Sequence, residues 1–289
     1  MKRAVVVGDV MVDVVARLDG PIARASDAPA RISFGAGGSA ANVAAWLAVA
    51  GASPVLIGRV GDDVRGREAR AALTAGGVDA RLAVDAERPT GTCVVIVEPG
   101  GERTMLPDAG ANDALAVGDL PAELFTAGAH LHVPGYALLR EGSRPAASSA
   151  IAMARNGRMT VSVDPSSAAL LSPAFLDLAA GAGLLVPNAE EARALTGDDD
   201  PEVAARRLSE RVAEVVVTLG EQGALWTDGR QLCRTPASFA AHVADTTGAG
   251  DAFAAGLIAA RLEGAEPRAA LIAACRLAAR AVATPGARP

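Results

Sequence analysis

The chain has 289 residues, of which 27 are basic and 33 acidic, so its formal net charge at pH 7 is −6. An acidic chain with 3% aromatic residues has neither the basic surface nor the stacking side chains of nucleic-acid binders, and we expect no nucleic-acid partner. Its hydrophobic content of 51% is enough to form a sizeable core.

The first apolar run and the cysteines indicate a cytoplasmic protein. Ala4–Val7 is too short for a signal peptide and is followed by Gly8 and Asp9. No stretch approaches the ~18 apolar residues of a membrane helix, so no membrane partner is expected. The three scattered cysteines, which form no metal-binding or disulfide pattern, are typical of a reducing compartment; they are Cys93, Cys233 and Cys275.

Hydrophobic periodicity and turn residues predict an alternation of strands and helices. In chain order, the first half contains strands Val5–Val7, Val12–Leu18 and Arg31–Phe34, helix Ser39–Ala50 with Ser39 as N-cap, strand Val55–Val60, helix Val64–Ala75, and strands Ala80–Val84, Thr92–Val97, Arg103–Leu106 and His130–Val133. The second half contains helix Pro145–Arg155, strand Thr160–Val163, helix Pro173–Ala180, strand Leu184–Val186, helices Ala189–Leu195 and Glu202–Arg211, strands Val215–Thr218, Gly223–Thr227, Gln231–Cys233 and Phe239–Val243, and helices Gly250–Arg261 and Pro267–Val282.

This alternation predicts an α/β fold with a central, mostly parallel sheet covered on both faces, in one domain spanning residues 1–289. Two hairpin-like segments, about residues 12–34 and 90–107, interrupt it without flanking helices of their own. We expect them to leave the main sheet and pair as a small lid. Because such a lid has exposed edges, we also expect a homodimer in which two lids cover each other.

The most informative motif is the segment Asp245-Thr-Thr-Gly-Ala-Gly-Asp251, which precedes an apolar helix. Small residues there leave backbone N–H groups open at a helix N-terminus, which favours an anion. Two acids beside a phosphate repel it unless cations are present and one acid acts as a base, so the segment favours phosphoryl transfer. Asp251 taken alone is more typical of an ordinary helix N-cap, but a cap does not explain the whole segment.

Two other phosphate-binding patterns are absent. A Walker A loop needs Gly-Lys-Ser/Thr, and the single lysine of this chain is Lys2. The first strand is followed by Gly8-Asp-Val-Met-Val-Asp13, without the Gly-x-Gly-x-x-Gly of a dinucleotide fold. A nicotinamide oxidoreductase is therefore disfavoured.

The segment Gly37-Gly-Ser-Ala-Ala-Asn42, together with Asp245–Asp251, resembles the two signatures of the ribokinase-like (PfkB) carbohydrate kinases. The resemblance extends from Gly8 to the terminal Pro-Gly-Ala-Arg. It implies a ribokinase-like three-layer α/β/α sandwich with a small β-sheet lid. It also implies an ATP-dependent kinase that transfers the γ-phosphoryl group to a hydroxyl of a small sugar or sugar derivative.

By this resemblance, Asp251 would be the general base, with an anion hole formed by Gly248, Ala249 and Gly250. Because such transition states are loose, a carboxylate of ordinary pKa, about 3.9, can serve. The acceptor would be bound by Asp13, Gly38, Ser39 and Asn42. Ribokinases usually carry Lys at the position of Ser39 and Asn at that of Met11, which disfavours ribose itself.

The same resemblance implies nucleotide and cation sites. Asn188-Ala-Glu-Glu191 is similar to an element of the Mg²⁺ and phosphate environment, with Asn188 and Glu191 acting through water; it also fits a helix capping box. Thr218, Gly220 and Gly223 would line the ATP. Asp245 and Thr247, with carbonyls near Thr284 and Gly286, match a monovalent-cation loop of some members, which makes K⁺ a candidate.

Two alternatives remain open, a nucleoside kinase of the same fold and a catalytically silent ligand-binding member. Phe34 is the one aromatic residue evident in the lid, which favours a sugar over a stacked base. We expect Arg103, in the second hairpin, to be a solvated surface charge, and His132 and Tyr136 to serve packing.

Overall fold

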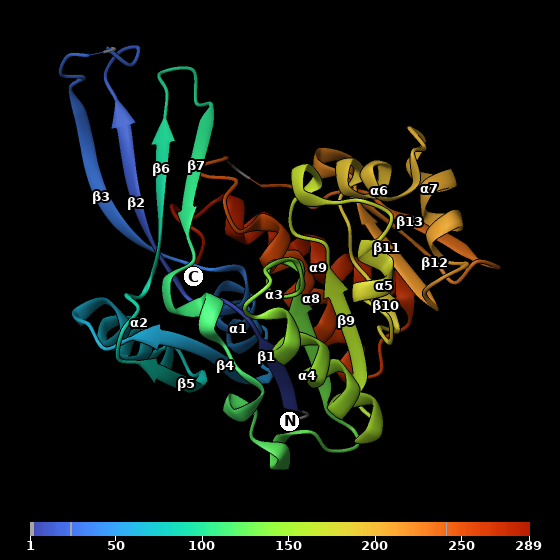
Figure 1. Ribbon diagram of the computed structural model, residues 1–289. Helices are drawn as coiled ribbons and strands as arrows, with labels where there is room; N and C mark the ends of the chain where they lie inside the picture. The colour runs from blue at the N-terminus through green and yellow to red at the C-terminus, as the bar shows by residue number, and fades with distance from the viewer. Residues whose placement is uncertain (1–2, 24, 241) are drawn as a thin grey trace.

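A computed structural model describes residues 3–23, 25–240 and 242–289, and it contains a nine-stranded and a four-stranded sheet (Figure 1). The large sheet has the order β13-β12-β11-β10-β9-β8-β1-β4-β5. Its strands are β1 (Arg3–Val7), β4 (Ser53–Gly61), β5 (Asp79–Asp85), β8 (His130–Pro134), β9 (Thr160–Asp164), β10 (Leu184–Leu185), β11 (Glu214–Thr218), β12 (Ala224–Thr227) and β13 (Leu232–Thr235). All neighbouring strands from β5 to β11 pair in parallel, and β12 and β13 are antiparallel, which confirms the mostly parallel α/β prediction.

Helices cover both faces of this sheet. The alternation along β1 shows the two faces: Ala4 and Val6 pack into one core cluster and Val5 and Val7 into another. The Ala4 side is covered by α1 (Ser39–Val49), α2 (Val64–Ala75), α8 (Ala249–Leu262) and α9 (Pro267–Val282). The Val5 side is covered by α3 (Gly135–Leu139), α4 (Arg144–Asn156), α5 (Phe175–Leu178), α6 (Ala189–Thr196) and α7 (Pro201–Leu208). Single-turn 3₁₀ helices lie at Gly110–Ala114, Val117–Asp119, Ala122–Leu124, Ala168–Leu170 and Gly220–Gln222.

The small sheet has the order β3-β2-β6-β7, with β2 (Met11–Leu18), β3 (Ala30–Gly37), β6 (Gly91–Val97) and β7 (Arg103–Asp108). Two antiparallel hairpins join through the parallel pair β2–β6, in a register that sets Asp13 opposite Cys93. The sheet projects from the body of the molecule beside the carboxyl ends of the large sheet's strands (Figure 1). One of its faces carries the buried cluster of Met11, Cys93, Val95 and Val97.

Three local predictions were wrong. Gly38, not Ser39, is the N-cap of α1, because its φ of 93° and the backbone of Asp9 within 3 Å leave no room for a side chain. No strand forms over Phe239–Val243 in the described residues, where Phe239 is 90% exposed and has nothing to pack against. The helix expected at Pro173–Ala180 is limited to α5, because the backbone hydrogen bonds before and after it join residues three apart, as in turns, and not four apart.

Within the described part of the chain, no helix is both long enough and apolar enough to cross a bilayer.

Candidate active site

A cavity of about 310 Å³ lies between the small sheet and the carboxyl ends of the central strands. In open α/β folds, ligands bind at this edge of the sheet. The small sheet contributes Met11, Asp13, Cys93, Met105 and Pro107, and the large sheet with its helices contributes Asp9, Gly38, Ser39, Asn42, Tyr136, Arg140, Asp164, Ser166, Val186, Asn188, Glu191, Thr218, Thr247, Gly248, Gly250 and Asp251. Residues from both ends of the chain therefore meet in one site.

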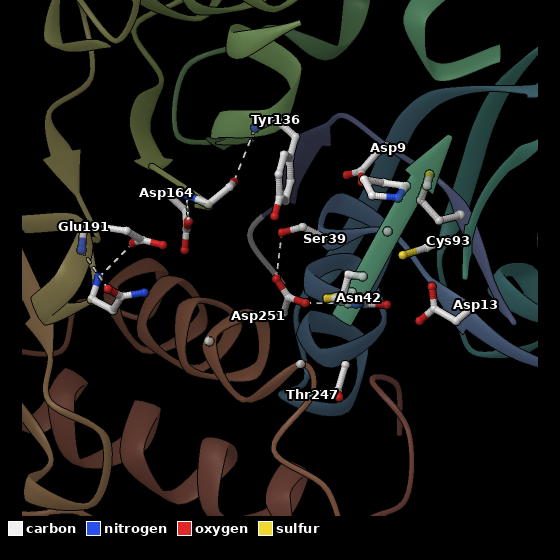
Figure 2. A pocket seen from close by; sticks show the side chains of 18 of the residues that line it. Asp9, Asp13, Ser39, Asn42, Cys93, Tyr136, Asp164, Glu191, Thr247 and Asp251 are labelled. Carbon is white, nitrogen blue, oxygen red and sulfur yellow. Dashed lines mark hydrogen bonds between the residues drawn. The ribbon is translucent and has the colours of Figure 1, made fainter. Parts of the chain in front are cut away.

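Asp251 lies at the centre of the cavity, as the third residue of α8 (Figure 2). Its Oδ1 accepts a hydrogen bond of 2.7 Å from the Ser39 hydroxyl, and its Oδ2 one of 2.9 Å from the Asn42 amide. The Nε of Arg288 donates to Asn42 Oδ1 at 3.0 Å, which fixes the orientation of that amide. The buried amide thus has partners on both sides, and Asp251 is positioned by α1 rather than used as a helix cap.

This environment gives Asp251 an unusual pKa. The pKa of its carboxyl is raised to about 7: burial is the main cause, the charges of Asp164 and Asp9 add to it, and the hydrogen bonds from Ser39 and Asn42 oppose it. The ordinary carboxylate assumed from the sequence is therefore not what the structure has. General-base catalysis is most effective when the pKa of the base lies near the working pH.

The loop before Asp251 exposes backbone N–H groups to the cavity. Gly248 is the N-cap of α8 with a φ of +77°, and a Cβ there would lie 2.5 Å from Ala287 O, so this position requires glycine. Gly250 lines the cavity with no atom within 4 Å of an added Cβ. Ala249, placed in the anion hole by the resemblance, is not among the lining residues. The open part of this helix terminus is formed by Gly248 and Gly250.

One part of the cavity carries Asp13, Gly38, Ser39 and Asn42, which the structure brings together. The pKa of Asp13 is raised to about 6, mainly by burial and against the opposing effect of the positive charge of Arg288. The hydroxyl of Ser39 is bonded to Asp251 rather than free for a ligand.

A pair of acids, Asp164 and Glu191, faces the cavity on the side of Asp251 opposite Asp13 (Figure 2). Glu191 and Asn188 form the capping box of α6, with bonds of 2.9 and 2.8 Å, so the structural role foreseen for them is present. Burial raises the pKa of both carboxyls, and the charge of Glu191 raises that of Asp164 further. Two neighbouring carboxylates provide the oxygen ligands that Mg²⁺ prefers.

Of the residues expected to line the nucleotide, Thr218 reaches the cavity and the two glycines do not. Gly220 has open space around it, and Gly223, with a φ of 94°, turns the chain into β12. Both lie in the turn that follows β11.

Several site residues were missed or misjudged from the sequence. Asp164 directly follows a predicted strand and Asp9 lies two residues after another. Since the carboxyl ends of parallel strands meet at one edge, these positions were a usable signal. Tyr136 lines the cavity, whereas His132 is buried in the core beside Ser162. Arg103 is not a solvated charge: it donates to Asp245 Oδ1 at 3.1 Å.

Comparison with known proteins identifies the family. The model of the pfkB family carbohydrate kinases matches residues 1–289. The chain is 35% identical to a fructokinase of Klebsiella pneumoniae over 88% of its own length and 82% of the relative's, and 33% identical to an ATP-dependent ribose-1-phosphate kinase of Halopiger xanaduensis over 90% and 84%. A crystal structure of adenosine kinase from Sinorhizobium meliloti superimposes with a TM-score of 0.91 at 25% identity, covering 100% of this chain and 96% of that one. The chain therefore belongs to the pfkB family of carbohydrate kinases and is an ATP-dependent kinase that acts on a sugar or a nucleoside.

Proposed function

We propose that this kinase transfers the γ-phosphoryl group of ATP to a hydroxyl of a neutral sugar, with Asp251 as the general base. The observation that carries the proposal is the position of Asp251: a carboxyl with a pKa of about 7 lies next to the open N–H groups of Gly248 and Gly250. The base removes the hydroxyl proton, and the helix terminus receives the transferred negative charge. Both groups face the same cavity.

The part of the cavity that carries Asp13, Gly38 and Asn42, which we assign to the acceptor, favours a polyol. Asp9 and Asp13 offer hydrogen-bond acceptors to hydroxyl groups, and their charges disfavour an anionic sugar at this end of the cavity. Tyr136 is the aromatic side chain that lines the cavity. Phe34 lies outside the cavity, is 61% exposed, and has the Arg65 guanidinium 4.4 Å from the centre of its ring. A nucleoside base could therefore stack on Tyr136 alone and not between two aromatic rings.

ATP and Mg²⁺ would occupy the other end. The residues that fit a divalent ion are Asp164, Glu191 and, through water, Asn188; Mg²⁺ is usually held by one or two carboxylates together with substrate phosphates. The bound ion would neutralise the phosphates and allow both acids to ionise. The nucleotide would extend past Thr218 toward the glycine turn at Gly220 and Gly223. The small sheet would act as a lid that excludes water.

The outer face of the small sheet supports a homodimer. The register places Ile32 and Phe34 of β3 on the same face as Leu106 of β7, and the three are 53–61% exposed. This face points away from the side of Met105 and Pro107, which line the cavity. An apolar face on a sheet with open edges is typical of an interface. Light scattering should give twice the chain mass, and a monomer at working concentration would contradict the dimer.

The direct test is ADP release with ATP and Mg²⁺ over pentoses, hexoses, sugar acids, sugar phosphates and nucleosides, comparing wild type with Asp251→Asn. We expect a neutral sugar to be phosphorylated and the variant to lose at least ~10²-fold in kcat, the contribution of a general base. A response to nucleosides alone would favour the nucleoside kinase. Bound ATP with no acceptor used would favour the catalytically silent alternative.

A further inference from the structure

Arg103 joins the small sheet to the loop that precedes the open helix terminus. It comes from β7, 142 residues away from Asp245, and its side chain is 34% exposed. The Nη1 donates to Asp245 Oδ1 at 3.1 Å and to the Thr247 hydroxyl, and Nη2 donates to the Thr246 hydroxyl at 2.6 Å. In Figure 1, β7 stands beside the segment that leads to α8.

These contacts use the groups that a monovalent cation would need. Asp245 Oδ1 also accepts from the Thr247 N–H at 2.9 Å and from the Thr247 hydroxyl at 2.7 Å, and Oδ2 accepts from the Gly286 N–H at 3.3 Å. The Thr247 hydroxyl gives its proton to Asp245 and accepts from Arg103. A cation at the side-chain oxygens of Asp245 and Thr247 would meet N–H and O–H protons and a guanidinium, so these two side chains do not fit K⁺.

Arginine can replace such an ion because its charge is permanent and its planar fork bonds several acceptors at once. Here, the fork holds the side chains of Asp245, Thr246 and Thr247 together. The next residue is Gly248, whose N–H begins the open terminus. A movement of this turn would therefore displace the anion hole and Asp251.

We propose that Arg103 takes the place of a monovalent cation, neutralising Asp245 and fixing the turn before Gly248, so that the enzyme works without K⁺. The proposal rests on the proposed function for its kinetic consequences. Arg103 touches neither substrate nor reacting atoms and is a positioning residue. Because it belongs to the small sheet, it also couples the position of that sheet to the geometry of the anion hole.

A first measurement needs no substrate. Hydrogen exchange of the segment 245–252 and the thermal unfolding midpoint are compared in KCl and in choline chloride at equal ionic strength. We expect wild type to behave identically in both salts. In Arg103→Met, the segment should exchange faster in choline chloride and be protected again by KCl. Arg81→Met, which removes an exposed arginine with a 2.8 Å bond to Asp79 on β5, is the matched control and should change neither quantity.

The second measurement is steady-state kinetics. Wild type should have the same kcat in KCl and in choline chloride, whereas Arg103→Met should lose at least about tenfold in kcat, the scale of a small misplacement, with little change in the KM for ATP. Guanidinium chloride at millimolar concentration, or KCl, should restore part of that kcat, and Arg103→Lys should be intermediate.

Two results would overturn the proposal: specific stabilisation or activation of wild type by KCl, or unchanged exchange and kcat in Arg103→Met. If wild type transferred no phosphoryl group to any acceptor, the proposed function would fail, and the exchange and unfolding data would still decide the role of Arg103.

Discussion

The hydrogen bond from Ser39 to Asp251 allows the basicity of the proposed base to be changed without removing the base. Replacing Ser39 by alanine deletes the 2.7 Å bond to Oδ1 and leaves that from Asn42. Both bonds favour the ionised carboxyl, and burial opposes them. The pKa of Asp251 should therefore rise in Ser39→Ala.

The magnitudes follow from the structure. With a pKa of about 7, roughly 1% of Asp251 is ionised at pH 5, so kcat/KM should be about 100-fold below its plateau. A carboxyl of ordinary pKa would be about 90% ionised at pH 5 and show almost no loss. A hydrogen bond to a charged acceptor contributes about 1.5–3 kcal/mol, and one pKa unit corresponds to about 1.4 kcal/mol. The pKa read from the acid limb should therefore rise by roughly one to two units in Ser39→Ala.

The assay is kcat/KM for the acceptor at saturating ATP and Mg²⁺ between pH 5 and 9, for wild type and Ser39→Ala. Titration of the nucleotide affects both proteins equally. A difference between the acid limbs of their two pH profiles therefore reports a group of the enzyme. Ser209→Ala, which removes an exposed hydroxyl bonded to a backbone oxygen of α7, is the control. Activity that stays flat down to pH 5, or limbs that coincide in the two proteins, would refute the role of burial and hydrogen bonding at Asp251.

Three further outcomes are expected. The pKa of Asp251 in the folded protein lies above its unfolded value of 3.8, so the stability contributed by the protonated form is lost as pH rises through about 7. The thermal unfolding midpoint of Asp251→Asn should therefore rise relative to that of wild type from pH 5 to pH 8. A constant difference between the two midpoints would contradict this. Gly248→Ala should lower the free energy of unfolding in urea by ~1–3 kcal/mol through backbone strain, whereas Gly250→Ala, which has open space, should fold normally. The stabilisation that MgCl₂ adds to the ADP complex should be lost in Asp164→Asn and in Glu191→Gln; circular dichroism should show helix content unchanged in the latter, because glutamine preserves the capping box.

The α/β architecture followed from local patterns in the sequence. Strand and helix periodicities are properties of neighbouring residues, so the sheet, the two hairpins and the helix after Asp251 could be placed to within a few residues. The glycine run before Asp251 indicated an anion site for the same reason, because the lack of side chains at a helix terminus is visible in the sequence. The errors in secondary structure were local: the N-cap of α1, the length of α5, and the strand expected over Phe239–Val243, where Phe239 is exposed.

What the sequence determined by itself was therefore the order of the elements, the open helix terminus and the acids available near it. Only the tertiary structure decided which of these groups meet. The pKa of Asp251 depends on burial against α1, more than 200 residues away in sequence, and Arg103 finds Asp245 across 142 residues. Desolvation and charge interactions depend on distances in space, and the chain pattern does not contain those distances until the two sheets enclose the cavity.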